Sequence, residues 1–135
     1  MASIRREILI DVPAAHAWDA LRDVGALHTR LVVGFVTDCR LDGDARIVTF
    51  ANGMVAREMI IDVSESEQRV VWSAVGGRLT HHNASAQVFA DGVGRSRLVW
   101  IADVLPNELA PAIATMIEQG TIAMKKTLEN TRIAA

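Results

Sequence analysis

NELAPAIATMIEQGTIAMKKTLENTR, residues 107–132, is the segment that most restricts the folds open to this chain. Its apolar residues recur at helical spacing and form one stripe about seven turns long. The stripe consists of Leu109, Ile113, Met116, Ile117, Gly120, Met124 and Leu128. Gly120 costs roughly 1 kcal/mol of helix propensity against alanine, which favours either a close backbone approach or open room beside the helix. A long helix with one apolar face needs a sheet to cover it.

The chain between residues 34 and 104 is typical of β-strands joined by tight turns. Asp42-Gly43 and Asn52-Gly53 favour hairpin turns because these residues tolerate positive φ. Short connections of this kind join antiparallel neighbours. The six predicted strands are GFVTDCRL (34–41), ARIVTFA (45–51), MVAREMIIDV (54–63), RVVWSAV (69–75), LTHHNASAQVF (79–89) and SRLVWIADV (96–104).

The N-terminal part adds one strand and two short helices. Residues 4–12 alternate apolar and charged positions, as a half-buried strand does. Pro13 suits the first turn of a helix over residues 14–24, and a second helical turn follows near residues 25–30. This order predicts an α+β fold over residues 1–135, a single domain. A curved antiparallel sheet of seven strands wraps the long C-terminal helix, and a cavity lies between them.

Four segments carry a resemblance to a known superfamily: IDVPAAHAWDALRDVGALH (10–28), VAREMI (55–60), VVWSAV (70–75) and SRLVWIADVLP (96–106). The chain resembles the START-like, or SRPBCC, superfamily over residues 3–131. The resemblance implies the helix-grip fold of polyketide cyclases and birch-pollen-allergen-like proteins. Members bind lipids, hormones, polyketides or hydrophobic metabolites, and some catalyse cyclisation or dehydration. The resemblance supplies no family-wide catalytic triad.

Composition excludes several classes of partner. The formal net charge is −2, from 14 basic and 16 acidic residues without a block of like charge, which argues against nucleic acid or an anionic membrane. No apolar run approaches the roughly 18 residues of a membrane span. Cys39 is the single cysteine, so no internal disulfide can form, and a reducing, cytoplasmic location is expected. We expect no cofactor and no metal, because no P-loop, GxGxxG or HExxH motif occurs.

His81 and His82 stand side by side in the strand 79–89. Neighbouring side chains of a strand point to opposite faces, so the two rings cannot share one metal or one cavity. His82 shares a face with Ala84, Ala86 and Val88, whereas His81 lies on the polar face. We expect His82 to reach the cavity, either as a rim residue bonded to a neighbour or as a catalytic group.

Glu58 shares a strand face with Met54, Ala56 and Ile60. A carboxyl group among apolar neighbours would have a raised pKa and could act as an acid or base near neutral pH. The alternative is an ion pair with Arg46 or Arg69 on an adjacent strand. The sequence leaves both interpretations open.

Tryptophans and methionines supply the expected wall of the cavity. Trp72 and Trp100 lie in buried strands, and their planar rings could hold a flat ligand. Met116 and Met124 flank Gly120 and adapt to different ligand shapes. The predicted ligand-binding residues are Phe35, Met54, Glu58, Trp72, His82, Trp100, Ile113, Met116, Ile117, Gly120 and Met124.

These residues favour binding of a small hydrophobic molecule, as in a carrier or sensor. The first alternative is an enzyme of the polyketide cyclase, aromatase or dehydratase type, with Glu58 and His82 as its acid and base. A further alternative is an interaction module of the co-chaperone type. The apolar segment 32–35 could then serve as a homodimer surface.

Overall fold

A computed structural model describes residues 1–131 of the chain. Its elements are β1 (Ala2–Ile10), α1 (Ala14–Leu21), the π-helical turn η1 (Leu27–Leu31), β2 (Val36–Asp42), β3 (Ala45–Phe50), β4 (Val55–Ser64), β5 (Arg69–Val75), β6 (His81–Ala90), β7 (Ser96–Leu105), the 3₁₀ turn η2 (Asn107–Leu109) and α2 (Ala110–Thr131). The predicted order of elements is confirmed. The first strand ends at Ile10 and not at Val12, and the second short helix is a π turn.

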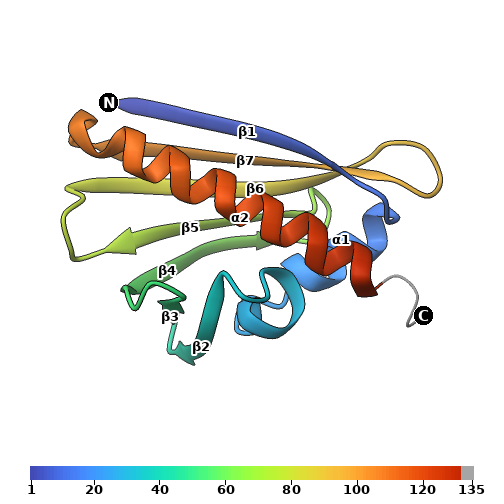
Figure 1. The fold of residues 1–135 in the computed structure, drawn as a ribbon, viewed down its shortest axis with the longest axis horizontal. Helices are drawn as coiled ribbons and strands as arrows, with labels where there is room; N and C mark the ends of the chain where they lie inside the picture. The colour runs from blue at the N-terminus through green and yellow to red at the C-terminus, as the bar shows by residue number, and fades with distance from the viewer. Residues whose placement is uncertain (132–135) are drawn as a thin grey trace.

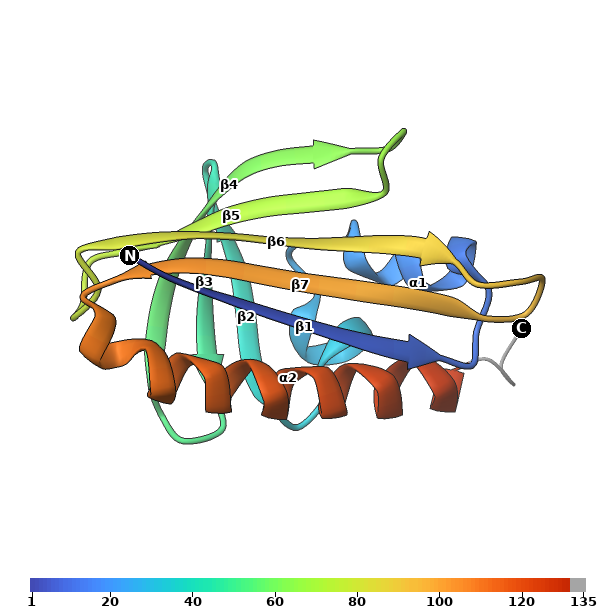
Figure 2. The same cartoon turned by 90° about the horizontal axis from the view of Figure 1, so that it is seen from above.

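The seven strands form one antiparallel sheet in the order β1-β7-β6-β5-β4-β3-β2. Helix α2 runs along one side of this sheet, and α1 and η1 lie near the C-terminal end of α2 (Figures 1 and 2). The predicted α+β helix-grip fold is therefore confirmed.

Local sequence explains the strand connections. Gly43 has φ = 61° and Gly53 has φ = 89°, so both predicted turns place glycine in the left-handed region that other residues avoid. In β4 the register with β5 shifts between Ile60 and Asp62. Such an irregularity bends a strand, which fits the curved sheet.

Helix α2 is held by the face that the sequence stripe predicts. Its buried residues are Ile117, Gly120, Thr121, Met124, Thr127 and Leu128. Polar contacts fix the helix at its sides: the Arg6 guanidinium bonds Glu118, and Thr127 Oγ1 accepts the Val33 N–H at 3.1 Å. None of the helices within residues 1–131 is both long and apolar enough to cross a membrane.

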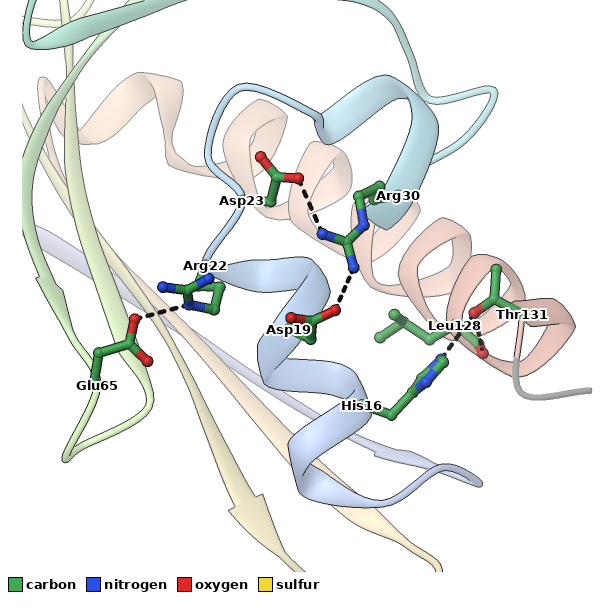
Figure 3. A network of polar contacts seen from close by, with 8 residues as sticks. All are labelled: His16, Asp19, Arg22, Asp23, Arg30, Glu65, Leu128 and Thr131. Carbon is green, nitrogen blue, oxygen red and sulfur yellow. Dashed lines mark hydrogen bonds and ion pairs between the residues drawn. The ribbon is translucent and has the colours of Figure 1, made fainter. Parts of the chain in front are cut away.

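A polar network ties α1 to the elements around it (Figure 3). Arg30 of η1 bonds Asp19 at 2.6 Å and Asp23 at 3.0 Å. Arg22 bonds Glu65, in the turn between β4 and β5, at 2.7 Å, and His16 contacts Thr131 at the end of α2. These contacts fix α1 and η1 against one end of the sheet and the last turn of α2.

Candidate functional site

A cavity of about 120 Å³ lies between the sheet and α2. Its wall is mostly apolar and includes residues of β3 to β7, α2, η1 and the segment that follows η1. The lining residues are Leu21, Leu27, Leu31, Val32, Phe35, Val36, Arg46, Val48, Phe50, Met54, Ala56, Glu58, Val70, Trp72, Ala74, Leu79, His82, Ala86, Trp100, Ala102, Ile113, Met116, Ile117 and Met124. An apolar cavity with a few grouped polar side chains is the usual form of a small-molecule site.

Every residue predicted to line the cavity does so except Gly120. A Cβ atom at Gly120 would lie 2.7 Å from the Trp100 ring, closer than packed atoms approach. Gly120 therefore serves the close approach of α2 to β7, and Trp100 takes its place in the wall. The close backbone approach, one of the two interpretations of this glycine, is the one observed, and a direct contact of Gly120 with a ligand stays a prediction.

Two pairs of aromatic rings shape the cavity. Trp72 and Trp100 lie with their ring centroids 5.9 Å apart and their planes tilted by 59°. Phe35 and Phe50 pack edge to face at 5.5 Å. Both tryptophans and both phenylalanines line the cavity, so aromatic rings make up a large part of its wall.

Glu58 is paired with Arg46. Arg46 Nε lies 2.8 Å from Glu58 Oε1, and only 5% and 11% of the two side chains are exposed. The two residues are cross-strand neighbours on β3 and β4. The ion pair, one of the two interpretations of Glu58, is thus the one observed, and a free carboxyl group in an apolar wall is not.

Arg46 is held at two further points. Its Nη1 donates to the Val24 carbonyl at 3.3 Å, and its guanidinium carbon lies 5.3 Å from the centre of the Trp72 ring. A cation over an indole face is electrostatically favourable, most of all away from water. These contacts fix the ion pair in place at the cavity wall.

His82 faces the interior and His81 is exposed, as the alternation of the strand predicts. His82 Nδ1 accepts the Ala74 N–H at 2.9 Å, and the His82 carbonyl accepts a hydrogen bond from Ser73 Oγ. Burial lowers the pKa of the His82 imidazole; the nearby Glu58 carboxylate opposes this shift, and His81 acts in the same direction as burial.

The polar residues of the cavity lie in one row across four strands. Arg46 on β3 stands opposite Glu58 on β4, Glu58 stands opposite Ala74 on β5, and the Ala74 N–H reaches His82 on β6. All four residues line the cavity. The row gives an otherwise apolar wall one polar edge.

Comparison with known proteins identifies the family. A sequence model described as "Polyketide cyclase / dehydrase and lipid transport" matches residues 1–132. The chain belongs to this family. Its membership confirms the predicted resemblance to START-like, SRPBCC proteins. No curated protein sequence matches the chain.

Solved structures share the fold of this polyketide cyclase/dehydrase family member. An uncharacterised Bacillus thuringiensis protein has a TM-score of 0.84 at 15% identity, with 94% of this chain and 98% of that chain covered. The didomain ARO/CYC protein BexL, of the BE-7585A biosynthetic pathway, has a TM-score of 0.80 at 16% identity, with 97% and 47% covered. Norcoclaurine synthase from Thalictrum flavum, in complex with dopamine and hydroxybenzaldehyde, has a TM-score of 0.73 at 17% identity, with 98% and 87% covered. At these identities the similarity shows the fold.

Arg46 is the main site residue of this family member that the sequence analysis did not propose for the site. The strand 45–51 puts Arg46, Val48 and Phe50 on one face, and all three line the cavity. Alternation along this strand is the signal that could have found them. The sequence analysis names Arg46 only as a possible partner for Glu58.

A surface cleft adjoins the cavity near the turn between β3 and β4. The cleft shares Phe35, Phe50, Met54, Ile113 and Met116 with the cavity wall. Met54 is 57% exposed, so its flexible side chain lies at the boundary between protein and solvent. Aromatic and methionine side chains therefore line both the cleft and the cavity.

No group of three or more histidine, cysteine, aspartate or glutamate side chains within residues 1–131 is arranged to hold a metal ion. Cys39 is buried, with its Sγ directed at the Val24 carbonyl, and burial raises the pKa of its thiol. A raised thiol pKa lowers the thiolate fraction, so Cys39 is a poor nucleophile in the folded chain.

Proposed function

We propose that this family member binds a small, predominantly apolar molecule in the cavity between the sheet and α2. The observation that carries the proposal is the cavity itself, which has an apolar wall, two tryptophans and a single polar edge. Its volume of about 120 Å³ is below the ~300–1,000 Å³ of drug-sized sites and near the ~150 Å³ of a protein cavity that binds benzene. A ligand of about one ring fits this space.

The structural comparisons are consistent with this size. Norcoclaurine synthase, which shares the fold, was solved with dopamine and hydroxybenzaldehyde, both of which contain a single aromatic ring. The description of the family also includes lipid transport. A longer lipid or polyketide would require the side chains between the cavity and the surface cleft to move apart, and Met54 and Met116 are flexible enough to do so.

Thermal unfolding and tryptophan fluorescence test the proposal with toluene, phenol and benzaldehyde as probes. A probe at 100 times its Kd should stabilise the chain by about 2.7 kcal/mol and raise its Tm by roughly 5–10 °C. Trp72 and Trp100 line the cavity, so the bound probe should also change their emission. The proposal is wrong if none of these neutral rings stabilises the wild-type chain.

Variants show whether the probe occupies this cavity. Ala86→Leu adds bulk to the lining and should abolish binding, whereas Ala90→Leu, on the same strand at an exposed position, should not. If the folding of Ala86→Leu fails by circular dichroism, Met116→Ala replaces it, because a larger cavity should then accept naphthalene. Equal binding by every variant would place the probe elsewhere.

An enzyme of the cyclase or dehydratase type is the second candidate. It is favoured by the position of Glu58 and His82 on one cavity wall, close enough for the carboxylate to affect the pKa of the imidazole. Exchange of the α-protons of cyclohexanone in D₂O, followed by NMR, would detect enolisation directly. Glu58→Gln or His82→Ala should slow a proton transfer made by that residue by roughly 10²-fold. Exchange no faster than in buffer would show that the chain does not catalyse enolisation of a ketone of this size.

A further inference from the structure

Strands β5 and β6 separate at the cavity, and His82 lies at the point of separation. The two strands pair only from Arg69↔Gln87 to Trp72↔Ala84, although β6 continues to pair with β7 as far as His81. Beyond Trp72, the N–H of Ala74 has no β6 backbone partner and donates instead to His82 Nδ1 at 2.9 Å. The imidazole thus replaces a backbone carbonyl as the hydrogen-bond acceptor for this strand N–H.

This hydrogen bond fixes the tautomer of the ring. A backbone N–H can only donate, so Nδ1 must be the unprotonated nitrogen and the single ring hydrogen must be on Nε2. Protonation of Nδ1 would set two N–H groups against each other at 2.9 Å. Burial acts in the same direction and lowers the pKa of His82. His82 is therefore a neutral ring with one donor, and its charged form is disfavoured by geometry as well as by desolvation.

Nε2 is the free end of this ring. Within residues 1–131 this nitrogen makes no hydrogen bond. The fully buried side-chain nitrogens and oxygens that lack a partner in this part of the chain are His28 Nδ1 and Ser96 Oγ, and Nε2 is not among them. Nε2 is therefore not fully buried and borders open space. His82 also borders a polar cleft on the outer side of the sheet. Two observations favour the cavity as the space that the ring faces. The His82 side chain lies on the inward face of β6, and it interacts with Glu58, which lines the cavity and does not line that cleft.

The remaining polar groups leave the cavity without net charge. Arg46 and Glu58 neutralise each other at 2.8 Å, and His82 is neutral. A charged ligand would lose its hydration and find no unpaired opposite charge, which is costly in an apolar site. A neutral ligand with a hydrogen-bond acceptor would satisfy the His82 donor instead.

We infer that His82 Nε2–H is the specificity donor of the cavity, and that it selects a neutral, ring-sized ligand with a carbonyl or ether-like oxygen. This inference rests on the proposed function, since it assigns the polar end of the same ligand. His82 acts here as a fixed donor to the ligand oxygen and does not cycle through its charged form.

Two isosteric probes and two complementary variants test the inference. Benzaldehyde and styrene have the same shape and differ by an oxygen in place of a CH₂ group. The wild-type chain should bind benzaldehyde about three- to tenfold more tightly, the effect of one net hydrogen bond. Benzoate, which is anionic at neutral pH, should bind at least tenfold more weakly than benzaldehyde.

In His82→Asn, the amide oxygen can still accept the Ala74 N–H, but the donor at the Nε2 position is lost. We expect this variant to bind both probes with the affinity that the wild type has for styrene. His82→Gln keeps a donor near the Nε2 position and should retain a preference for benzaldehyde. A preference that persists in His82→Asn, or that is absent from a wild-type chain that binds styrene, would overturn the inference.

Long-range ¹H–¹⁵N NMR of the ligand-free protein separates this result from a failure of the proposed function. The His82 ring, assigned by its loss in His82→Asn, should show the Nε2–H tautomer at pH 7, and its pKa should lie below the ordinary value of a histidine imidazole. The Nδ1–H tautomer at pH 7, or a His82 pKa above that ordinary value, would refute the role of His82 even if both probes bind. If neither probe binds the wild type but toluene or phenol does, the ligand preference fails and the proposed function stands; if no neutral ring binds, both fail.

Discussion

Arg46 and Glu58 form an ion pair within the sheet, and this pair governs what their side chains can do. Both are almost fully buried and face the cavity. Burial of two charges is costly, and the cost is offset only by close contact and by further hydrogen bonds. Arg46 has these in the Val24 carbonyl and the Trp72 ring. The pair therefore gives the cavity polarity without net charge.

Removal of one member of this pair should be far more damaging than removal of both. Arg46→Met or Glu58→Met alone leaves an unpaired buried charge and should lower the free energy of unfolding by about 3–5 kcal/mol. The double variant should recover most of that loss, because Met fills the space without charge. Urea denaturation of the four chains measures the coupling in a double-mutant cycle.

The exposed pair Arg57–Asp42 is a matched control for this cycle. It also joins β4 to the β2–β3 hairpin, at 2.6 Å, but its side chains are 43% and 53% exposed. Its removal should have a much smaller effect because solvent screens the charges. Additive effects of the Arg46 and Glu58 substitutions would show that the two charges are not coupled in solution.

At the scale of elements, the contact of α2 with β7 sets one wall of the cavity. Gly120 lets the helix backbone approach the Trp100 ring, and Met116, Ile117 and Met124 on either side of it line the space beside the ring. A helix that carried a larger residue here would stand further from the sheet. The glycine thus lowers the helix propensity of α2 but allows the helix to pack closely against the sheet.

Gly120→Ala should test this balance. Alanine gains roughly 1 kcal/mol of helix propensity, but its Cβ would force the Trp100 ring to move, and overpacking costs about 1–3 kcal/mol. We expect a net loss of roughly 1 kcal/mol in the free energy of unfolding, together with a shift in tryptophan emission. Ile122→Ala, at an exposed position of the same helix, should leave the emission unchanged. A stabilised Gly120→Ala variant would contradict the close approach.

In the whole molecule, segment 32–35 contributes more side chains to the cavity wall than to the outer surface. Val32 is 4% exposed and, like Phe35, lines the cavity, whereas Val33 is 54% exposed. A homodimer through this segment stays a prediction, and Val33 is the large apolar side chain that the segment offers to a partner. The cytoplasmic location stays a prediction as well.

Light scattering after size exclusion tests the homodimer. If segment 32–35 forms it, the wild-type chain should have twice the 14.7 kDa mass of one chain, and Val33→Asp should reduce this to one chain by placing a charge in the contact. A Val33→Thr variant keeps the shape of the side chain and serves as the control. A dimer that survives Val33→Asp would exclude this segment as its surface.

Much of the site follows from the strand alternation. The period of two in residues 79–89 predicts that His82 faces inward, and the apolar stripe from Leu109 to Leu128 faces the same space. In residues 54–63 both strand faces are largely apolar, so alternation groups Glu58 with Met54, Ala56 and Ile60 without deciding which face lines the cavity. Arg46 obeys the same alternation and could have been included. Alternation does not show which residue of the neighbouring strand lies opposite a given side chain. Glu58 had two candidate arginines, and the register puts Arg46 opposite it while Arg69 pairs with Ser64.

An antiparallel sheet that wraps one long helix could be predicted from the residues alone, because hydrophobic period, turn residues and helix length are local properties of each segment. The resemblance to START-like proteins added the helix-grip fold. Strand alternation also predicts that His81 and His82 point to opposite faces. Three features became visible only in the folded chain: Glu58 is paired with Arg46, Gly120 packs against the Trp100 ring, and His82 accepts the Ala74 N–H where β5 and β6 separate. Each of these depends on strand register and on contacts between residues far apart in the chain, which the packing of the whole sheet sets.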